Sequence, residues 1–349
     1  MSVFDHPEFD QHERVAFIHD QETGLQAIIA VHNTTLGPSL GGCRMYPYST
    51  SAEALTDVLR LAKGMSYKAA LANLPQGGGK SVIIGDPRQP KSAALMRKMG
   101  EFVDSLQGQY IVAEDSGISV QDIHHMAERT EYAGGVNAEF DYLGNPADGN
   151  PSPATAYGVF VGIKAALAHR LEQSLDETTV AIQGIGQVGY RLAELLHQAG
   201  AKLIVADTYQ PNVARAVAEL GAEVMSVEEI HYANADVLAP CALGATINEK
   251  TLPDIQASII AGAANNQLAR DEHGAQLLQK GILYAPDYVI NAAGIIDIFH
   301  QHNNSSPARL KAHIEAIGTT LSDIFVQSQA ENLPTNVVAD RMAENKFRK

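Results

Sequence analysis

The sequence predicts an α/β protein of two domains, and three observations support this fold class. The chain has 349 residues, about twice the roughly 150 residues of a typical domain. Along it, short apolar runs of strand type alternate with longer segments whose apolar residues recur at helical spacing. Near the middle, residues 134–153 are rich in glycine, proline and asparagine and show little periodicity. Such a composition is typical of a connection between domains.

These observations set the expected domain organisation. We expect the first α/β domain to span residues 1–135 and the second residues 150–329, with a cleft between the two. Residues 136–149 are expected to form the hinge. The tail is expected to be helical from Pro307 onward, and residues 330–349 are candidates for packing back on the first domain.

Composition restricts the class of protein and of partner. Hydrophobic residues make up 45% of the chain and charged residues 19%, which is typical of a globular protein rather than a disordered one. The formal net charge of −15 disfavours nucleic acid and anionic membranes as partners. The N-terminus is polar, without the apolar core of a signal peptide, and no apolar run approaches the roughly 18 to 20 residues that span a bilayer. The two cysteines, Cys43 and Cys241, form no zinc spacing, so we expect a cytoplasmic protein without a metal.

In the first half, residues 14–19 and 26–32 are brief β-type runs around a Glu-Thr-Gly turn. Thr50 and Glu53 have the spacing of a capping box, which predicts that a helix begins there. Apolar residues at helical spacing continue that helix as far as Met65. Residues 81–84 and 110–113 are expected to be buried strands, and the glycine-rich residues 36–45 are expected to form a turn.

The second half repeats a regular strand–helix order. A long helix is expected over 154–169, followed by strands at 179–183 and 202–207 and helices that end near 198 and 220. Later apolar runs at 235–239, 257–261 and 281–284 predict three more strands. This order predicts a parallel sheet that is covered by helices on both faces.

A glycine motif predicts a dinucleotide site in this second sheet. Gly184, Gly186 and Gly189 form a GxGxxG sequence between a predicted strand and a predicted helix, the arrangement of a Rossmann-type domain. The helix N-terminus would face the pyrophosphate with free N–H groups. Asp207 ends the next strand, where its carboxylate can bind ribose hydroxyls and repel a 2′-phosphate, which favours NAD over NADP. The alternative is a glycine turn that binds nothing.

A second glycine-rich segment carries a lysine. Residues 74–81 are LPQGGGKS, which resembles a P-loop, but Leu74 stands where the first P-loop glycine would be, so we reject that interpretation. Lys68 and Lys80 could instead share a cleft in which a lysine acts as general base. Asp115, after an apolar strand, could be a catalytic carboxylate. The alternative for the two lysines is that they lie on the surface beside a turn. The alternative for the acids after the strand, such as Glu114, is that they only cap the following helix.

Together these segments resemble the glutamate/leucine/phenylalanine/valine dehydrogenase family, over nearly the whole chain. Residues 74–87, LPQGGGKSVIIGDP, match the lysine signature of that family. Within the family the chain is most similar to the leucine dehydrogenases. The other matching segments are LGPSLGGCRM, RLAKGMSYKAA, GNPSPATAYGV, GIGQVG, APCALGATIN, AGAANNQL and APDYVINAAG.

The resemblance implies an NAD-dependent oxidoreductase that deaminates an L-amino acid, reversibly, to a 2-oxo acid and ammonia through an iminium intermediate. It assigns the substrate carboxylate to Lys68 and the Gly41–Gly42 backbone. Lys80 would be the general base that activates water, and Asp115 would exchange a proton with the amino group. It also implies that the first domain binds substrate and mediates assembly. The expected assembly is a homo-oligomer, either an octamer or a dimer. The resemblance places the cofactor on Gly184, Gly186, Gln187, Val188, Gly189, Asp207, Cys241, Ala242 and Asn265, and Asn265 also beside the substrate.

The resemblance also indicates the substrate class. The family's side-chain pocket corresponds here to Leu40, Ala113, Ile295 and Ile298, with Met65 nearby, and all five are apolar. An unpaired substrate carboxylate would be costly there, so glutamate is disfavoured. Two isoleucines, where valine is frequent in leucine dehydrogenases, favour leucine, valine and isoleucine over phenylalanine or tryptophan. We therefore expect a role in branched-chain amino acid catabolism.

Three positions depart from the leucine dehydrogenase pattern. Gly134 stands where threonine is usual, Ala293 replaces a glycine and Asp297 replaces an asparagine. The segment 137–150 is also longer than usual. Two other functions remain open: the same reaction on an aromatic amino acid, and a non-catalytic homologue that binds NAD or an amino acid.

Overall fold

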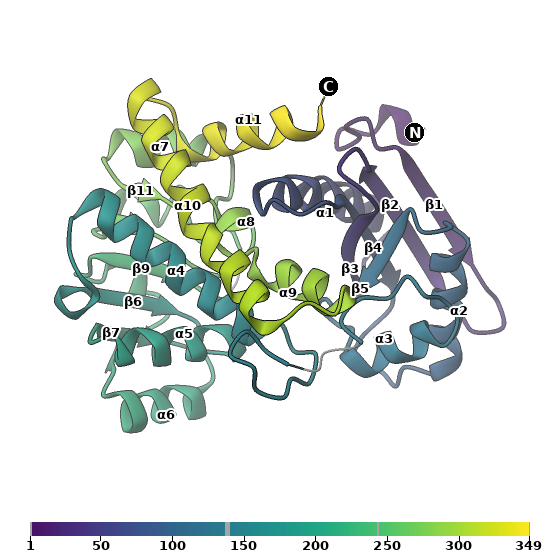
Figure 1. The fold of residues 1–349 in the computed structure, drawn as a ribbon, viewed down its shortest axis with the longest axis horizontal. Coiled ribbons are helices and arrows are strands. Elements are labelled where there is room, and N and C mark those ends of the chain that lie inside the picture. Colours follow the sequence, from purple (N-terminus) through teal and green to yellow (C-terminus); the bar gives the residue numbers. More distant parts are fainter. Residues whose placement is uncertain (1, 137–139, 243, 349) are drawn as a thin grey trace. The chain divides into compact units, whose positions relative to one another are not determined.

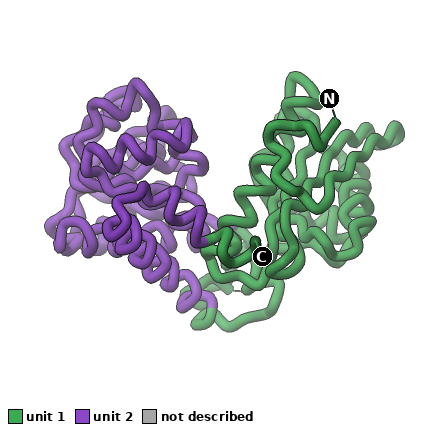
Figure 2. The backbone as a smooth tube through the Cα atoms, turned by 90° about the horizontal axis from the view of Figure 1, so that it is seen from above, with its two compact units in different colours: residues 1–150, 295–309, 343–349 green, residues 151–294, 310–342 purple. Residues whose placement is uncertain are grey.

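The computed structural model describes residues 2–136, 140–242 and 244–348. These residues form two compact units, which Figure 2 distinguishes by colour. Unit 1 comprises residues 1–150, 295–309 and 343–349, and unit 2 comprises residues 151–294 and 310–342. No helix in the described ranges is long and apolar enough to cross a membrane. The predicted hinge includes residues 137–139, which lie outside the described ranges.

Unit 1 contains a mixed five-stranded sheet of order β1-β2-β4-β3-β5. The pairs β1–β2 and β2–β4 are antiparallel, whereas β3 runs parallel to β4 and to β5. Its strands are β1 (Arg14–His19), β2 (Gln26–Asn33), β3 (Ser39–Tyr46), β4 (Gly77–Ile84) and β5 (Tyr110–Ala113), and its helices include α1 (Ser51–Leu71), α2 (Ala93–Asp104) and α3 (Val120–Ala127) (Figure 1).

The alternation of buried residues along the strands places helices on both faces of this sheet. Ile28 and Ala30 of β2 and Val82 of β4 pack with apolar residues of α1. The next residues of the same strands, such as Ile29 and Ile83, join a separate core with α2 and α3. Successive strand residues point to opposite faces, so α1 covers one face and α2 and α3 cover the other.

Unit 2 contains a six-stranded parallel sheet of order β11-β10-β9-β6-β7-β8. In chain order this is the doubly wound Rossmann arrangement, and the order reverses between β6 and β9. The strands are β6 (Thr179–Gln183), β7 (Lys202–Ala206), β8 (Glu223–Val224), β9 (Val237–Pro240), β10 (Ile259–Ile260) and β11 (Leu283–Tyr284). The helices are α4 (Ser152–Arg170), α5 (Gln187–Gln198), α6 (Gln210–Leu220), α7 (Glu272–Gln279), α8 (Asp287–Ile290), α9 (Ala293–His302), α10 (Pro307–Glu331) and α11 (Thr335–Phe347), although α9 to α11 contribute residues to both units.

One predicted element of unit 1 is wrong. The segment 36–45, predicted as a glycine-rich turn, contains most of β3, a strand in the middle of the sheet. The strand tolerates its glycines because β4 and β5 pack closely on either side: a Cβ on Gly41 would overlap the backbone of Gly79. Strand β4 also begins at Gly77 rather than Ser81. Helices α2 and α3 were not predicted.

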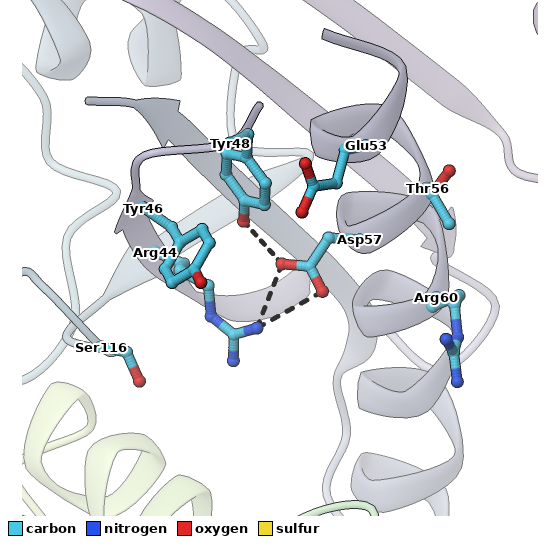
Figure 3. Close-up of a pocket in the computed structure, with 8 residues that line it drawn as sticks. All are labelled: Arg44, Tyr46, Tyr48, Glu53, Thr56, Asp57, Arg60 and Ser116. Carbon is cyan, nitrogen blue, oxygen red and sulfur yellow. Dashed lines mark hydrogen bonds and ion pairs between the residues drawn. The ribbon is translucent and has the colours of Figure 1, made fainter. Parts of the chain in front are cut away.

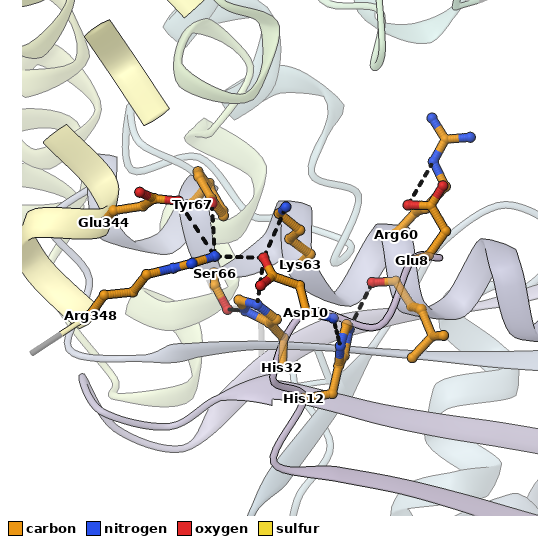
Figure 4. Close-up of polar contacts among 11 residues, drawn as sticks. Glu8, Asp10, His12, His32, Arg60, Lys63, Ser66, Tyr67, Glu344 and Arg348 are labelled. Atoms are coloured by element: carbon orange, nitrogen blue, oxygen red, sulfur yellow. Dashed lines mark hydrogen bonds and ion pairs between the residues drawn. The ribbon is translucent and has the colours of Figure 1, made fainter. Parts of the chain in front are cut away.

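The C-terminal residues of α11 dock on unit 1. Arg348 lies 2.5 Å from Asp10 Oδ2, and the Tyr67 hydroxyl donates to Glu344 Oε1 at 2.6 Å (Figure 4). The ring centroids of Phe347 and Tyr67 are 5.3 Å apart. These contacts attach residues 343–348 to Asp10 and to the second half of α1, whereas residues 330–342 belong to unit 2.

Candidate active site

The face of the unit 1 sheet that carries α1 also carries the candidate catalytic groups. Lys80 pairs across the sheet with Ala30, which packs on α1, so both side chains point to that face. Lys80 is only 6% exposed. Its Nζ lies 2.6 Å from Oδ2 of Asp115, which follows β5. A strand middle and a strand end thus bring together a lysine and a carboxylate that can exchange a proton directly.

Arg44 is a second cation at Asp115, and no motif in the sequence indicates its role. The Arg44 Nε donates to Asp115 Oδ2 at 3.3 Å. Burial opposes ionisation of Asp115, but the charges of Lys80 and Arg44 outweigh it and hold its pKa at about 2. Asp115 is therefore a carboxylate at neutral pH.

Arg44 is itself held from its other side. Its NH1 donates to Asp57 Oδ2 at 3.1 Å, and the Tyr48 hydroxyl donates to the same oxygen at 2.6 Å. These residues line a cavity of about 520 Å³, together with Arg60 and others (Figure 3). The row Tyr48–Asp57–Arg44–Asp115 therefore connects this cavity to the candidate catalytic pair. The remaining lining residues are Tyr46, Glu53, Thr56 and Ser116.

The three consecutive glycines of β4 bring α1 close to the site. A Cβ on Gly78 would overlap the backbone of Ser66 in α1. One on Gly77 would overlap the Asn33 carbonyl, and one on Gly79 would lie 2.9 Å from Cδ2 of Tyr110. The glycines thus allow close contact with the protein itself. Because α1 rests on Gly78, the adjoining residues 65–68, which include Met65 and Lys68, lie over β4.

An apolar cluster forms the next part of this face. Leu40 pairs with Ile111 and Gly42 with Ala113, so these residues share one face. Leu40, Ile111 and Ala113 pack with Ile298 of α9, and Ile295 and Tyr132 lie against the cluster, half-buried. Four predicted pocket residues, Leu40, Ala113, Ile295 and Ile298, therefore come together.

Glu114 does not cap a helix. Ser119 caps α3, in a capping box with Asp122. The Oε2 atom of Glu114 is buried and has no hydrogen-bond partner among the described residues. Burial and the neighbouring charges of Asp115 and Asp148 raise the pKa of Glu114.

The predicted dinucleotide residues meet where the strand order of unit 2 reverses. Gly184 follows β6 with a φ of +88°, a conformation that favours glycine. A Cβ on Gly184 would lie 2.6 Å from the Ala242 Cβ, and one on Gly189 would lie 3.3 Å from the Cys241 Cβ. Among the described residues, a Cβ on Gly186, before α5, would meet nothing within 4 Å, and no side chain caps that helix. Space and free N–H groups are therefore present where a pyrophosphate would lie, with Gln187 and Val188 in the first turn of α5.

Asp207 is tied to the glycine turn. Its Oδ2 accepts a hydrogen bond from the Ile185 N–H and its Oδ1 accepts one from the Tyr209 N–H, both at 2.8 Å. Asn265 is held in unit 2 by a hydrogen bond of 2.7 Å from Asn291 Nδ2 to its Oδ1. Burial raises the pKa of the Cys241 thiol to about 12, so this cysteine packs against the turn as a thiol. The described residues contain no cluster of three or more metal-ligating side chains.

Comparisons with known proteins agree with this geometry. Residues 12–132 match the family model described as the Glu/Leu/Phe/Val dehydrogenase dimerisation domain, and residues 150–214 and 208–333 match the model of the Glutamate/Leucine/Phenylalanine/Valine dehydrogenases. The leucine dehydrogenase of Geobacillus stearothermophilus is 47% identical over 99% of this chain and 94% of its own. A phenylalanine dehydrogenase of Bacillus thermotolerans is 43% identical over 97% of this chain and 89% of its own.

A solved structure shows the same fold. The crystal structure of L-tryptophan dehydrogenase from Nostoc punctiforme superposes with a TM-score of 0.83, at 41% identity and over 96% of both chains. Leucine, phenylalanine and tryptophan dehydrogenases are thus similar to this chain at comparable sequence identity. The comparisons therefore identify the family and not the substrate. The chain belongs to the glutamate/leucine/phenylalanine/valine dehydrogenase family of NAD(P)-dependent amino acid dehydrogenases.

Proposed function

We propose that the protein catalyses the reversible, NAD-dependent oxidative deamination of a branched-chain L-amino acid, leucine, valine or isoleucine, to its 2-oxo acid and ammonia. The observation that carries this proposal is the apolar cluster of Leu40, Ile111, Ala113 and Ile298 on the sheet face that also bears Lys80. It offers a site for an uncharged aliphatic side chain beside groups that can handle an amine and a carboxylate.

The roles follow from the chemistry of the substrate. Lys68 and the Gly41–Gly42 backbone bind the substrate carboxylate. Asp115, ionised at neutral pH, takes a proton from the substrate ammonium group, because the amine must be neutral before hydride leaves Cα. Lys80, 2.6 Å from Asp115, in its neutral form takes a proton from the water that attacks the iminium carbon. Asp115 returns its proton to the nitrogen of the resulting carbinolamine, and ammonia leaves as the hydroxyl loses its proton to give the 2-oxo acid.

The cofactor supplies the hydride acceptor when it is bound, on Gly184, Gly186, Gly189 and the first turn of α5. Asn265, oriented by Asn291, is assigned to the substrate and nicotinamide. Asp207 favours NAD, because its carboxylate accepts from ribose hydroxyls and repels a 2′-phosphate. The next basic residue along the chain, Arg215, contacts Glu219 at 3.1 Å and lies over the Tyr190 ring, so a 2′-phosphate would have to compete with Glu219 for it.

The size of the proposed pocket distinguishes aliphatic amino acids, the first candidate substrates, from aromatic ones, the second. Ile298 extends to Gly134, where a Cβ would lie 2.8 Å from its Cγ2, so the branched side chain fills the space that the small glycine leaves. This favours an aliphatic substrate. An aromatic amino acid remains the second candidate, because phenylalanine and tryptophan dehydrogenases are among the relatives.

We also propose that the protein works as a homo-oligomer, a dimer or an octamer. The model that matches residues 12–132 is described as a dimerisation domain. In that region, β1 lies at one edge of the sheet and exposes Phe17, which is 56% accessible. An edge strand with an exposed aromatic side chain is a natural site for a second subunit.

The rate of NADH formation with a panel of amino acids tests the proposed function. The panel contains leucine, valine, isoleucine, phenylalanine, tryptophan and glutamate, each with NAD and with NADP at mildly alkaline pH. We expect the three aliphatic substrates with NAD to be fastest. A faster aromatic substrate would contradict the assigned pocket, and faster turnover with NADP would contradict the role of Asp207.

A lysine variant separates an enzyme from a non-catalytic binding protein. Lys80→Ala should abolish turnover and leave NAD affinity within about twofold, because Lys80 lies in unit 1 and the glycine turn in unit 2. If the wild type binds NAD but turns over no amino acid, the protein is a binding homologue and the proposed function is wrong.

A further inference from the structure

The pairing of β3 with β4 is interrupted at Gly41 and Gly42. Pairing stops after Leu40 and resumes at Cys43 in the same register. The two missing pairs share one ladder hydrogen bond, in which the Gly42 N–H would donate to the carbonyl of Gly79. A Cβ on Gly41 would overlap that carbonyl, so the oxygen of Gly79 lies against residue 41. Among the described residues, the Gly42 N–H is left without a ladder acceptor in β4.

A buried tyrosine holds the other end of this peptide group. The Tyr110 hydroxyl donates to the Gly41 carbonyl at 2.7 Å and lies 3.4 Å from the Gly42 carbonyl. Ser81 Oγ lies 3.0 Å from the same hydroxyl. A phenol has only one proton to donate. Because the Tyr110 hydroxyl donates its proton to the Gly41 carbonyl, the Ser81 hydroxyl must donate to the oxygen of Tyr110. Tyr110 and Ser81 are both fully buried.

The tyrosine acts from the face of the sheet opposite to the active site. Tyr110 packs in the core that α2 and α3 cover, whereas Lys80 shares its face with α1. The Gly41–Gly42 peptide bond is trans, so its C=O and N–H point in opposite directions. Drawing the Gly41 carbonyl toward Tyr110 therefore tilts the Gly42 N–H toward the face of Lys80 and Asp115.

We propose that Tyr110, supported by Ser81, is a positioning residue for the substrate carboxylate: it holds the Gly41–Gly42 peptide so that the Gly42 N–H points out of the sheet as a donor. The inference rests on the proposed function, which places the substrate carboxylate at Lys68 and these glycines. It explains why a tyrosine–serine pair occupies a core in which phenylalanine and alanine would satisfy packing alone.

Tyr110→Phe tests this role, because it keeps the ring and removes only the hydroxyl. Inhibition constants are measured for two fragments of leucine: 4-methylpentanoate, which lacks the amine, and 3-methylbutylamine, which lacks the carboxylate. Without the Tyr110 hydroxyl, the Gly41–Gly42 peptide can rotate so that the Gly42 N–H again donates to the Gly79 carbonyl in β4. We expect the KM for leucine and the inhibition constant of 4-methylpentanoate to rise about five- to tenfold. The values for 3-methylbutylamine and NAD should stay within twofold.

Two further variants keep the test decisive. Tyr288→Phe also removes a partly buried hydroxyl, one that donates to Asp340 in unit 2, and it should move neither inhibition constant. Ser81→Ala should shift the 4-methylpentanoate value in the same direction as Tyr110→Phe but less, and it replaces that variant if Tyr110→Phe does not fold. Equal changes for the two fragments, or no change for either, would overturn the inference.

The result is separable from a failure of the proposed function. If the wild type turns over no amino acid, the proposed function fails whatever the variants do. If the wild type turns over leucine and Tyr110→Phe retains its affinity for 4-methylpentanoate, only the role of Tyr110 is wrong.

Discussion

Ile298 occupies the volume that a side chain at position 134 would need: a Cβ on Gly134 would lie 2.8 Å from Ile298 Cγ2 and 3.7 Å from Ile111 Cγ2. Two separate features of the sequence, a glycine where threonine is usual and an isoleucine where valine is frequent, are thus in direct contact. A smaller residue at one position makes room for a larger one at the other. We infer that the two positions together set the width of the proposed site for the substrate side chain.

This contact predicts coupling between the two positions. Gly134→Ala alone should lower kcat/KM for leucine about tenfold, because overpacking by one methyl group displaces Ile298 at a cost of about 1–3 kcal/mol. Adding Ile298→Val should recover most of the loss. A double-mutant cycle on kcat/KM measures the coupling, which we expect to exceed about 1 kcal/mol. Gly64→Ala is the control, since a Cβ there meets nothing within 4 Å, and additive effects at 134 and 298 would refute the coupling.

The sequence predicts a structural feature well when the residues that contact one another lie close together along the chain. The Rossmann half is predicted well, because GxGxxG, the preceding strand and the following helix are one continuous segment. Strand β3 is missed, because local propensity favours a turn for its glycines while pairing with β4 and β5 stabilises a strand. Arg44 and Tyr110 are missed for a similar reason: their partners Asp115 and Gly41 lie 71 and 69 positions away.

Asp207 has two roles, and this predicts an asymmetric change in cofactor use. Because its carboxylate also accepts from the Ile185 N–H in the glycine turn, Asp207→Ala should weaken NAD binding at least tenfold and improve NADP binding little. Adding Thr208→Arg, at an exposed position, supplies a cation for a 2′-phosphate and should lower the KM for NADP. Steady-state constants with both cofactors check this, and an unchanged NAD/NADP ratio in Asp207→Ala would contradict the ribose contact.

Arg44 is predicted to support catalysis through Asp115. Arg44→Gln removes a charged hydrogen bond to the carboxylate, a loss of about 1.5–3 kcal/mol, so kcat/KM should fall roughly ten- to a hundredfold with NAD affinity unchanged. Asp57→Asn, which loosens only the far side of Arg44, should have a smaller effect. Arg60→Gln is the matched control, because Arg60 lines the same cavity and is 61% exposed, near Glu8. A loss of activity in Arg60→Gln as large as that in Arg44→Gln would refute the specific role.

Asp297 is predicted to destabilise the protein above neutral pH. It lies in α9 with only 5% of its surface exposed, and its Oδ1 has no hydrogen-bond partner among the described residues. Burial, opposed by a hydrogen bond from Gln301 and reinforced by the charge of Asp141, raises the pKa of Asp297 to about 6. The unfolded chain ionises this group near pH 3.9. Between those two values the folded state binds the extra proton, so stability falls as pH rises.

Asp297→Asn should therefore stabilise the protein at pH 8, by at most about 3 kcal/mol, because the amide stays neutral where the buried carboxylate is charged. Near pH 4 the carboxyl is protonated in the folded state, and the two proteins should have nearly equal free energies of unfolding. Denaturant unfolding at both pH values measures the difference, with the exposed Asp254→Asn as control. A stability gain that is the same at both pH values would show that Asp297 is not held protonated in the folded state, and that the substitution acts through packing instead.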